Sequence, residues 1–212
     1  MAYLIGISGG SASGKTTFIN NLKDVFDEKH LAVLSMDHYY KPLQHQKLDK
    51  AGAPNFDMPE SIDLVNFLND LDRLKRGEHV LKREYTFNNP EKIPEMMAIS
   101  PASIIIVEGL FVFEEKEIAE QLDLKLFLDV EEEIRWQRRL ERDLKERGLN
   151  YDDIHYQWHN HVKPSFDKYL LPHKSLVDII ILNNQGFENG INMVINYLKL
   201  LIIEEQNNLL LK

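Results

Sequence analysis

The chain has 212 residues, 43% of them hydrophobic and 28% charged, which is typical of a globular protein with one substantial core. Its formal net charge of −9 argues against nucleic acid as a partner, because phosphate backbones bind basic surfaces. The absence of cysteine excludes disulfides and thiolate chemistry, and it fits a reducing, cytoplasmic compartment. We find no signal-peptide pattern and no apolar run long enough to span a bilayer, so we expect no membrane association.

Short apolar runs alternate with amphipathic segments along the chain. Runs rich in branched residues predict buried parallel strands at residues 4–7, 32–35, 104–107, 125–129 and 177–182. Helical spacing of apolar residues predicts helices at residues 16–27, 62–76, 131–147, 151–169 and 191–206. This alternation predicts an α/β protein in which helices cover both faces of a doubly wound, five-stranded parallel sheet.

Two stretches do not fit the alternation of strands and helices. Residues 80–87 and 93–99 flank the turn-like Asn88-Asn89-Pro90, so we expect a β-hairpin lobe at about residues 78–100. The loop at residues 41–59 contains Gly, Pro and Asn and is long enough to face a substrate. Without internal repeats, the sequence predicts one domain over residues 1–212.

A glycine-rich motif near the N-terminus indicates which ligand the chain binds. It fits the pattern G-x-x-x-x-G-K-[ST] and stands between a predicted strand and a predicted helix, as in a phosphate-binding P-loop. A glycine turn that binds no nucleotide is the alternative. In a P-loop, Lys15 bridges the β- and γ-phosphates and Thr16 ligates Mg²⁺. We therefore expect ATP, or GTP, to bind to Gly9, Gly10, Ser11, Ala12, Ser13, Gly14, Lys15, Thr16 and Thr17.

Two carboxylates follow predicted strands at the edge of the sheet where ligands bind. Asp37 follows the second strand, where it can accept the proton of a substrate hydroxyl and orient that hydroxyl. A helix cap or a solvated loop residue is the alternative for Asp37. Glu108 follows an apolar run, as in a Walker-B strand, although a strand-end acid without a special role is the alternative. We expect Mg²⁺ to be held by Thr16, Asp37 and Glu108.

The predicted helix at residues 131–147 is locally basic in an acidic chain. A solvated face with pairs to Glu131, Glu132 or Asp143 is one interpretation. Because a P-loop enzyme needs cations over the transferring phosphoryl group, we favour a lid at about residues 131–150 that ends at Gly148. Four arginines share an arc of about 100° on this helix: Arg135, Arg138, Arg139 and Arg142.

Two other features point to less specific roles. His155 and His159 share a helix face, but Tyr156 stands where a zinc-protease motif has Glu, so we do not expect zinc. The segment at residues 191–211 carries more apolar residues than one buried face needs. Both a subunit interface and a core helix explain this excess.

Several motifs in the correct order resemble the uridine kinase family of P-loop nucleoside kinases. They are GISGGSASGKT at 6–16, DHYY at 37–40, NFDMP at 55–59, EG at 108–109, RRLERDLKERG at 138–148, VKPSF at 162–166 and DIIIL at 178–182. The resemblance implies the three-layer fold of P-loop kinases and a homo-oligomer, a tetramer or dimer. It also implies transfer of the ATP γ-phosphate to the 5′-hydroxyl of uridine or cytidine.

The resemblance also implies roles for individual residues. Asp37 is expected to be the catalytic base. Asp57 and Arg139 are expected to hold the ribose diol, with Arg139 also counted as catalytic. Arg142 and Arg147 are expected near the phosphates. The walls of the nucleoside pocket are expected to be Tyr40, Tyr85 and Phe87.

Three positions depart from the family's pattern, and all concern recognition of the base. Pro90 and Met58 stand where the family has His, and Leu149 stands where it has a base-reaching Arg. Asn88 or Asn89 offers substitute contacts, although a turn is the simpler role of that pair. Since buried hydrogen-bonding groups discriminate strongly between substrates, their loss is expected to relax or redirect the preference for a base.

We therefore predict an ATP- and Mg²⁺-dependent kinase that acts on a nucleoside or another ribose-like compound. A related P-loop kinase for a sugar phosphate or a vitamin-like alcohol is one alternative. A nucleotide-dependent switch, which binds a partner and transfers little phosphate, is the other. Asp37 and the arginine-rich segment favour transfer, and an Asn-Lys-x-Asp run that reads guanine is absent.

Overall fold

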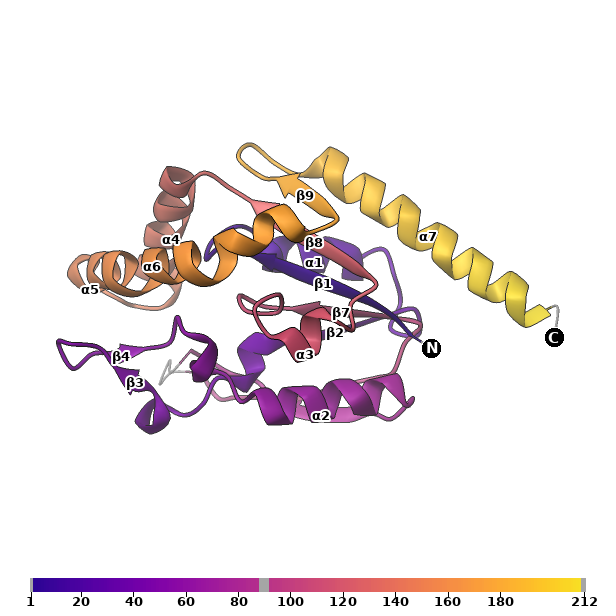
Figure 1. Ribbon diagram of the computed structural model, residues 1–212, viewed down its shortest axis with the longest axis horizontal. Coiled ribbons are helices and arrows are strands. Elements are labelled where there is room, and N and C mark those ends of the chain that lie inside the picture. The colour runs from indigo at the N-terminus through magenta and orange to yellow at the C-terminus, as the bar shows by residue number, and fades with distance from the viewer. Residues whose placement is uncertain (1, 88–91, 211–212) are drawn as a thin grey trace.

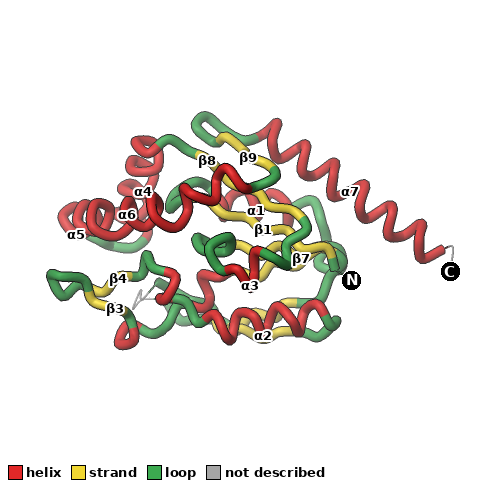
Figure 2. Tube along the Cα trace, in the orientation of Figure 1, coloured by secondary structure: helices red, strands yellow, loops and turns green. Residues whose placement is uncertain are grey.

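The computed structural model describes residues 2–87 and 92–210, and these residues form an α/β fold (Figures 1 and 2). Within them, the central sheet has five strands in the order β2-β7-β1-β8-β9, and all neighbours pair in parallel. The predicted five-stranded parallel sheet is confirmed. Its strands are β1 (Tyr3–Gly9), β2 (Leu31–Ser35), β7 (Ile104–Glu108), β8 (Leu124–Asp129) and β9 (Ile179–Leu182).

Successive strand residues point to opposite faces, so the sheet separates two apolar cores. Leu4 belongs to one core together with Phe67 and Leu71, while Ile5 belongs to the other together with Phe18 and Leu198. Both faces are therefore covered by helices, which makes three layers (Figure 1). The first core is closed by α2 (Leu64–Lys75) and α3 (Lys116–Ala119), and the second by α1 (Lys15–Lys23) and α7 (Glu188–Leu210).

Two short antiparallel pairs lie outside the main sheet. The predicted hairpin is formed by β5 (Val80–Arg83) and β6 (Met96–Ile99), with Val80 paired to Ile99. The predicted turn at Asn88-Asn89-Pro90 lies outside the described residues. A second pair, β3 (Lys47–Leu48) and β4 (Pro54–Asn55), shapes the loop at residues 41–59.

The predicted helix at residues 151–169 is helical but not one regular α-helix. After α4 (Glu132–Glu146), α5 (Tyr151–Gln157) passes into a π-helical turn at Trp158–Val162, then α6 (Lys163–Ser165) and a second π-turn at Phe166–Leu170. Pro164 lies between the two wide turns. Since proline has no N–H and clashes with the preceding turn, the regular α-helical ladder is interrupted there.

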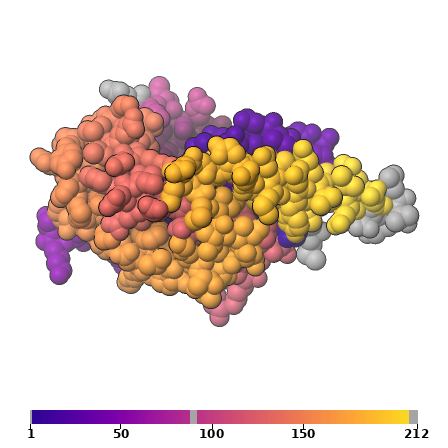
Figure 3. Space-filling model, turned by 90° about the horizontal axis from the view of Figure 1, so that it is seen from above, coloured from indigo at the N-terminus to yellow at the C-terminus, as the bar shows by residue number. Residues whose placement is uncertain are grey.

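The ends of two helices also differ from the prediction. α1 ends at Lys23 instead of residue 27, and Val25, beyond its end, is 44% exposed. α7 is longer than predicted, and its C-terminal half extends past the rest of the molecule (Figures 1 and 3). In the described part of the chain, no helix combines the length and apolarity needed to cross a bilayer.

Candidate active site

The glycine-rich loop occupies the turn between β1 and α1, as the sequence predicts. The backbone at Ala12 and Gly14 has φ values of 62° and 91°, a left-handed conformation that turns N–H groups toward one side. The amide of Asn183, just after β9, donates to the carbonyl oxygen of Ser13 at 2.9 Å. A Cβ atom on Gly14 would lie 2.5 Å from that amide nitrogen. The loop is therefore held in shape from behind, with the N-terminus of α1 available to an anion.

The side chain of Lys15 folds back over the glycine-rich loop. Its Nζ donates to the carbonyl oxygen of Gly9 at 2.9 Å. Burial lowers the pKa of Lys15, while the carboxylates of Glu108 and Asp37 act in the opposite direction. Phosphate oxygens placed in this loop would supply a further anion to the buried ammonium group.

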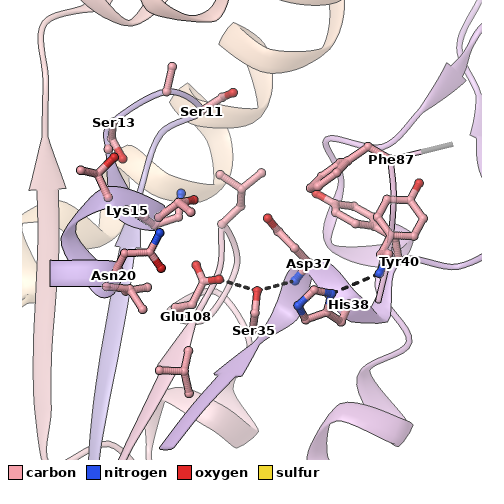
Figure 4. A pocket seen from close by; sticks show the side chains of 18 of the residues that line it. Ser11, Ser13, Lys15, Asn20, Ser35, Asp37, His38, Tyr40, Phe87 and Glu108 are labelled. Carbon is pink, nitrogen blue, oxygen red and sulfur yellow. Dashed lines mark hydrogen bonds between the residues drawn. The ribbon is translucent and has the colours of Figure 1, made fainter. Parts of the chain in front are cut away.

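The two predicted carboxylates meet at the carboxyl ends of adjacent strands (Figure 4). Ser35 is paired with Glu108 in the sheet, and its hydroxyl donates to Oε1 of Glu108. The same hydroxyl accepts a hydrogen bond from the backbone N–H of Asp37 at 3.3 Å. Burial, and next the charge of Asp37, raise the pKa of Glu108 to about 7. Ser35 caps the short 3₁₀ turn, so the cap alternative for Asp37 is wrong and its carboxylate remains available to ligands.

The basic face of α4 points into the protein, not into solvent. Arg139 is 6% exposed and donates to Oγ of Ser11 at 2.8 Å and to Oε1 of Gln157 at 3.0 Å. Arg135 is also buried, and its Nη1 lies 2.5 Å from where a Cβ on Gly10 would be. The opposite side of the helix carries Leu144, which is 45% exposed. The face is therefore not solvated, although its expected pair with Asp143 is present, and α4 directs cations at the phosphate-binding loop.

Asp143 organises these cations, and the pair with Asp143 that the sequence offered is present, but it is buried instead of solvated. Its carboxylate is fully buried and lies 3.2 Å from Nε of Arg139, 2.8 Å from Nε of Arg142 and 3.4 Å from Nε of Arg147. The available signal was its spacing, since arginines stand four residues before it, one before it and four after it. One buried anion thus holds three arginines beside the predicted phosphate site.

Aromatic rings form the opposite end of the site. The ring of Tyr40 lies 5.2 Å from that of Tyr85 and 5.9 Å from that of Phe56, and Tyr85 lies 5.2 Å from Phe87. The backbone N–H of Tyr85 donates to Nδ1 of His38 at 3.2 Å, which ties the hairpin to the Asp37 turn. These rings provide flat apolar surfaces against which a planar ligand can pack.

Asp57 lies in the same region, two residues after the end of β4. Burial raises the pKa of Asp57, and the nearby charges of Arg139, His161 and Arg147 act against that rise. Arg139 and Asp57 therefore influence each other, as the predicted pair for a ribose diol requires.

One cleft of about 1380 Å³ joins the phosphate loop, the carboxylates and the aromatic rings. Every predicted site residue lines it except Gly9 and Gly10, which lie in the P-loop itself. Leu149 also lines the cleft, so one of the departures from the family pattern lies at the site, while Met58 follows Asp57 in the chain. Pro90, the third departure, lies outside the described residues together with Asn88 and Asn89.

The described residues contain no group of three or more His, Cys, Asp or Glu side chains able to hold a metal ion. His155 and His159 instead lie side by side at the surface, with ring centroids 4.4 Å apart. A cation that enters with a triphosphate needs fewer protein ligands, because phosphate oxygens and water supply the rest. Thr16, Asp37 and Glu108 line one cleft, and their hydroxyl and carboxylate oxygens suit Mg²⁺.

A phosphate-binding loop, an acceptor-side carboxylate and a buried set of arginines share this cleft at the carboxyl ends of a parallel sheet. That combination is typical of P-loop kinases, enzymes that transfer a phosphoryl group from ATP. The chain belongs to the Phosphoribulokinase / Uridine kinase family, whose model matches residues 4–186.

Individual relatives agree with this assignment. A uridine kinase of Staphylococcus haemolyticus is 36% identical over 84% of this chain and 86% of its own length. Uridine-cytidine kinase-like 1 of Mus musculus is 35% identical over 92% of this chain, but the chain spans only 36% of that protein. The structure of phosphoribulokinase from Rhodobacter spheroides superposes with a TM-score of 0.57 at 17% identity, covering 85% of this chain and 70% of that one, which shows a shared fold.

Proposed function

We propose that the protein transfers the γ-phosphate of ATP to the 5′-hydroxyl of a nucleoside, uridine or cytidine. The observation that carries the proposal is the position of Asp37, in one cleft with Lys15 and with the aromatic rings of Tyr40 and Tyr85. The names of the relatives, uridine kinase and uridine-cytidine kinase-like, support the choice of acceptor.

In the proposed reaction, Asp37 orients the acceptor hydroxyl and accepts its proton as the oxygen attacks the γ-phosphorus. Lys15 and the arginines of α4 stabilise the negative charge on the transferring group, which is the main contribution of protein groups to phosphoryl transfer. The bond from the γ-phosphorus to the bridging oxygen breaks, so ADP leaves and the acceptor becomes a phosphate monoester.

We propose Thr16, Asp37 and Glu108 as the residues that hold Mg²⁺, which neutralises charge on the β- and γ-phosphates when it is bound. The raised pKa of Glu108 supports this assignment, because its burial and the nearby charge of Asp37 disfavour the carboxylate, and a bound cation would favour it. ATP is the proposed donor, and GTP is the alternative.

On the acceptor side, we propose that Asp57 and Arg139 hold the ribose hydroxyls. A carboxylate accepts and a guanidinium donates, which together match a vicinal diol. Stacking of a base against Tyr40, Tyr85 and Phe87 follows from the rings in the cleft.

The test is ADP release with ATP, Mg²⁺ and one acceptor at a time: uridine, cytidine, adenosine, guanosine, ribose, or none. The proposal predicts release that depends on uridine or cytidine. A rate that is the same with and without every acceptor would reject kinase activity and favour the nucleotide-dependent switch.

A second candidate is a related kinase for another ribose-like or vitamin-like alcohol. Leu149 in the cleft and Met58 beside Asp57 favour it, because neither side chain can hydrogen-bond to a base as the family's residues do. Comparable kcat/KM values for uridine, adenosine and ribose would support this candidate over pyrimidine preference.

We further propose a homo-oligomer, a dimer or tetramer. Support comes from the exposed apolar side chains along α7, among them Met193, Leu200 and Ile203, at 72%, 59% and 51% exposure. Because the proposed reaction consumes ATP, we propose the cytoplasm as its location.

A further inference from the structure

Three side chains from two segments far apart in the sequence meet beside the cleft, and one of them, His161, lines it. Oδ2 of Asp49 accepts a hydrogen bond from the hydroxyl of Tyr156 at 2.6 Å and lies 2.7 Å from Nε2 of His161. Its other oxygen accepts the backbone N–H groups of Ala51 and Ala53. These bonds, that of Tyr156 first, lower the pKa of Asp49, so an ionised carboxylate accepts and Nε2 of His161 donates.

This cluster connects the two walls of the cleft. Among the described residues, every other hydrogen bond from residues 41–61 ends within residues 41–62, as in the bonds of Gln46 to Lys41 and of Ser61 to Asn55. Figure 1 shows the β3–β4 loop on one side and α5 on the other. The Asp49 side chain is therefore the hydrogen-bonded link from this loop to α5 and the turn that follows it.

The cluster is largely shielded from water, which strengthens its hydrogen bonds. The side chain of His161 is 3% exposed and that of Asp49 is 14% exposed. A charge-assisted hydrogen bond away from water is stronger than one at an exposed site, and removing one partner leaves the other unsatisfied. Surface pairs such as Lys47 with Glu60 lack this protection.

The link holds together the two groups assigned to the acceptor. Asp57 follows Asp49 by eight residues in the same loop. Arg139 is hydrogen-bonded to Gln157, the neighbour of Tyr156 in the chain. His161 also lines the cleft, close to Asp57.

We propose that Asp49, Tyr156 and His161 form an acceptor-loop latch, which fixes the loop at residues 41–59 across the cleft and keeps Asp57 opposite Arg139. The proposal rests on the proposed function, since it concerns the acceptor half of that site. The three residues are positioning residues. They act through the loop and not on the phosphates.

The first test is steady-state kinetics of His161→Leu and His161→Gln with the best acceptor found for the wild type. Loss of a charge-assisted hydrogen bond is expected to raise the acceptor KM about tenfold or more in His161→Leu, with the ATP KM changed less than about twofold. Glutamine retains an N–H donor, so His161→Gln is expected to recover most of the acceptor affinity.

Asp49→Asn with His161→Leu forms a double-mutant cycle. Because both variants break one link, the double variant is expected to be little worse than either single one. His159→Asn is the matched control, since His159 lies on the same helical segment but is exposed. Equal rises in the KM values for acceptor and ATP, or additive effects in the cycle, would overturn the latch.

Amide hydrogen exchange tests the latch without any activity. The latch predicts faster exchange at residues 47–57 in His161→Leu than in the wild type or His159→Asn, with unchanged exchange in the central strands. If the wild type phosphorylates no acceptor, the proposed function fails while this comparison still decides the latch. Unchanged exchange at residues 47–57 in a folded His161→Leu variant would contradict it.

Discussion

Asp37 follows β2 and Glu108 ends the adjacent strand β7, yet the surroundings of the two carboxylates differ. Ser35 donates to Glu108 and also receives the backbone N–H of Asp37, so one hydroxyl fixes both positions. Both side chains line the cleft, but Glu108 is 9% exposed, whereas Asp37 is half-buried. These surroundings support the proposed roles, proton transfer for Asp37 and support of the cation for Glu108.

Asp37→Asn is expected to lower kcat on the order of 10²- to 10⁴-fold, because an amide cannot accept the acceptor's proton. ATP binding should persist, since Lys15 and the loop amides are unchanged. Stopped-time kinetics and calorimetric titration with ATP check the two parts, with the exposed Asp152→Asn as control. A kcat within about threefold of the wild type would exclude Asp37 as the base.

The raised pKa of Glu108 predicts that the stability of the folded protein depends on pH. Its pKa is raised in the folded protein to about 7 by burial and by Asp37, above the value of 4.5 for an exposed glutamate. The folded state therefore holds a proton that the unfolded state has released, so this group lowers stability as pH rises from about 4.5 to 7.

Glu108→Gln removes that titration. Without nucleotide, the variant is expected to lose less Tm than the wild type between pH 5 and pH 8, because its amide stays neutral. Thermal unfolding at both pH values measures the difference, with the exposed Glu133→Gln as control. Parallel losses of Tm in wild type and Glu108→Gln would show that Glu108 is ionised throughout.

At the scale of elements, α4 is built around a buried anion. Asp143 has no exposed side-chain surface and receives three arginines, while Leu144 on the outer side is 45% exposed. The helix is thus packed with its charged face inward, the reverse of an ordinary amphipathic surface helix.

Asp143→Asn leaves three clustered arginines with no buried counter-charge. Breaking such a network is expected to destabilise the fold by about 3–5 kcal/mol and to reduce kcat/KM for ATP. Urea unfolding followed by circular dichroism measures the first effect, and added ATP should recover part of the lost stability by supplying anions. A midpoint equal to that of the wild type would indicate that Asp143 is not a structural counter-ion.

The elements show where sequence patterns succeed and where they fail. The strands were predictable because each is a short apolar run buried on both faces, as in Ile104–Glu108. The helical stretch after Asn150 was not, because Pro164 and two π-turns break the 3.6-residue period. The helical period also predicted that the arginines share one face of α4. It could not predict that this face is the buried one.

The candidate site divides in the same way. The positions of the P-loop, Asp37 and Glu108 were predictable because each belongs to a short sequence motif at the end of a strand. Asp49 and His161 are 112 residues apart, so only tertiary structure brings them together. Asn183, which holds Ser13, likewise lies 170 residues from its partner.

At the scale of the molecule, the order β2-β7-β1-β8-β9 explains why one cleft contains the whole site. The carboxyl ends of β1, β2 and β7 lie at one edge, which places the P-loop, Asp37 and Glu108 side by side. Residues of α4 and of the segment that follows β4 line the cleft, from elements that lie apart in the sequence (Figure 1).

The exposed apolar surface of α7 gives a prediction for assembly. If α7 packs against another copy, Leu200→Glu is expected to shift the protein to a smaller species, because a charge would be buried at the interface. Light scattering after size exclusion measures the mass, with Asn192→Glu on the same helix as a control. A monomeric wild type would contradict the proposed oligomer.

The most direct test of the central claim is phosphorus NMR of the product formed from ATP, Mg²⁺ and uridine. The account predicts a new monoester resonance coupled to the 5′-methylene protons, at a rate strongly reduced in Asp37→Asn. The account would be contradicted if inorganic phosphate were the sole product and formed at the same rate with and without uridine or any other hydroxyl acceptor.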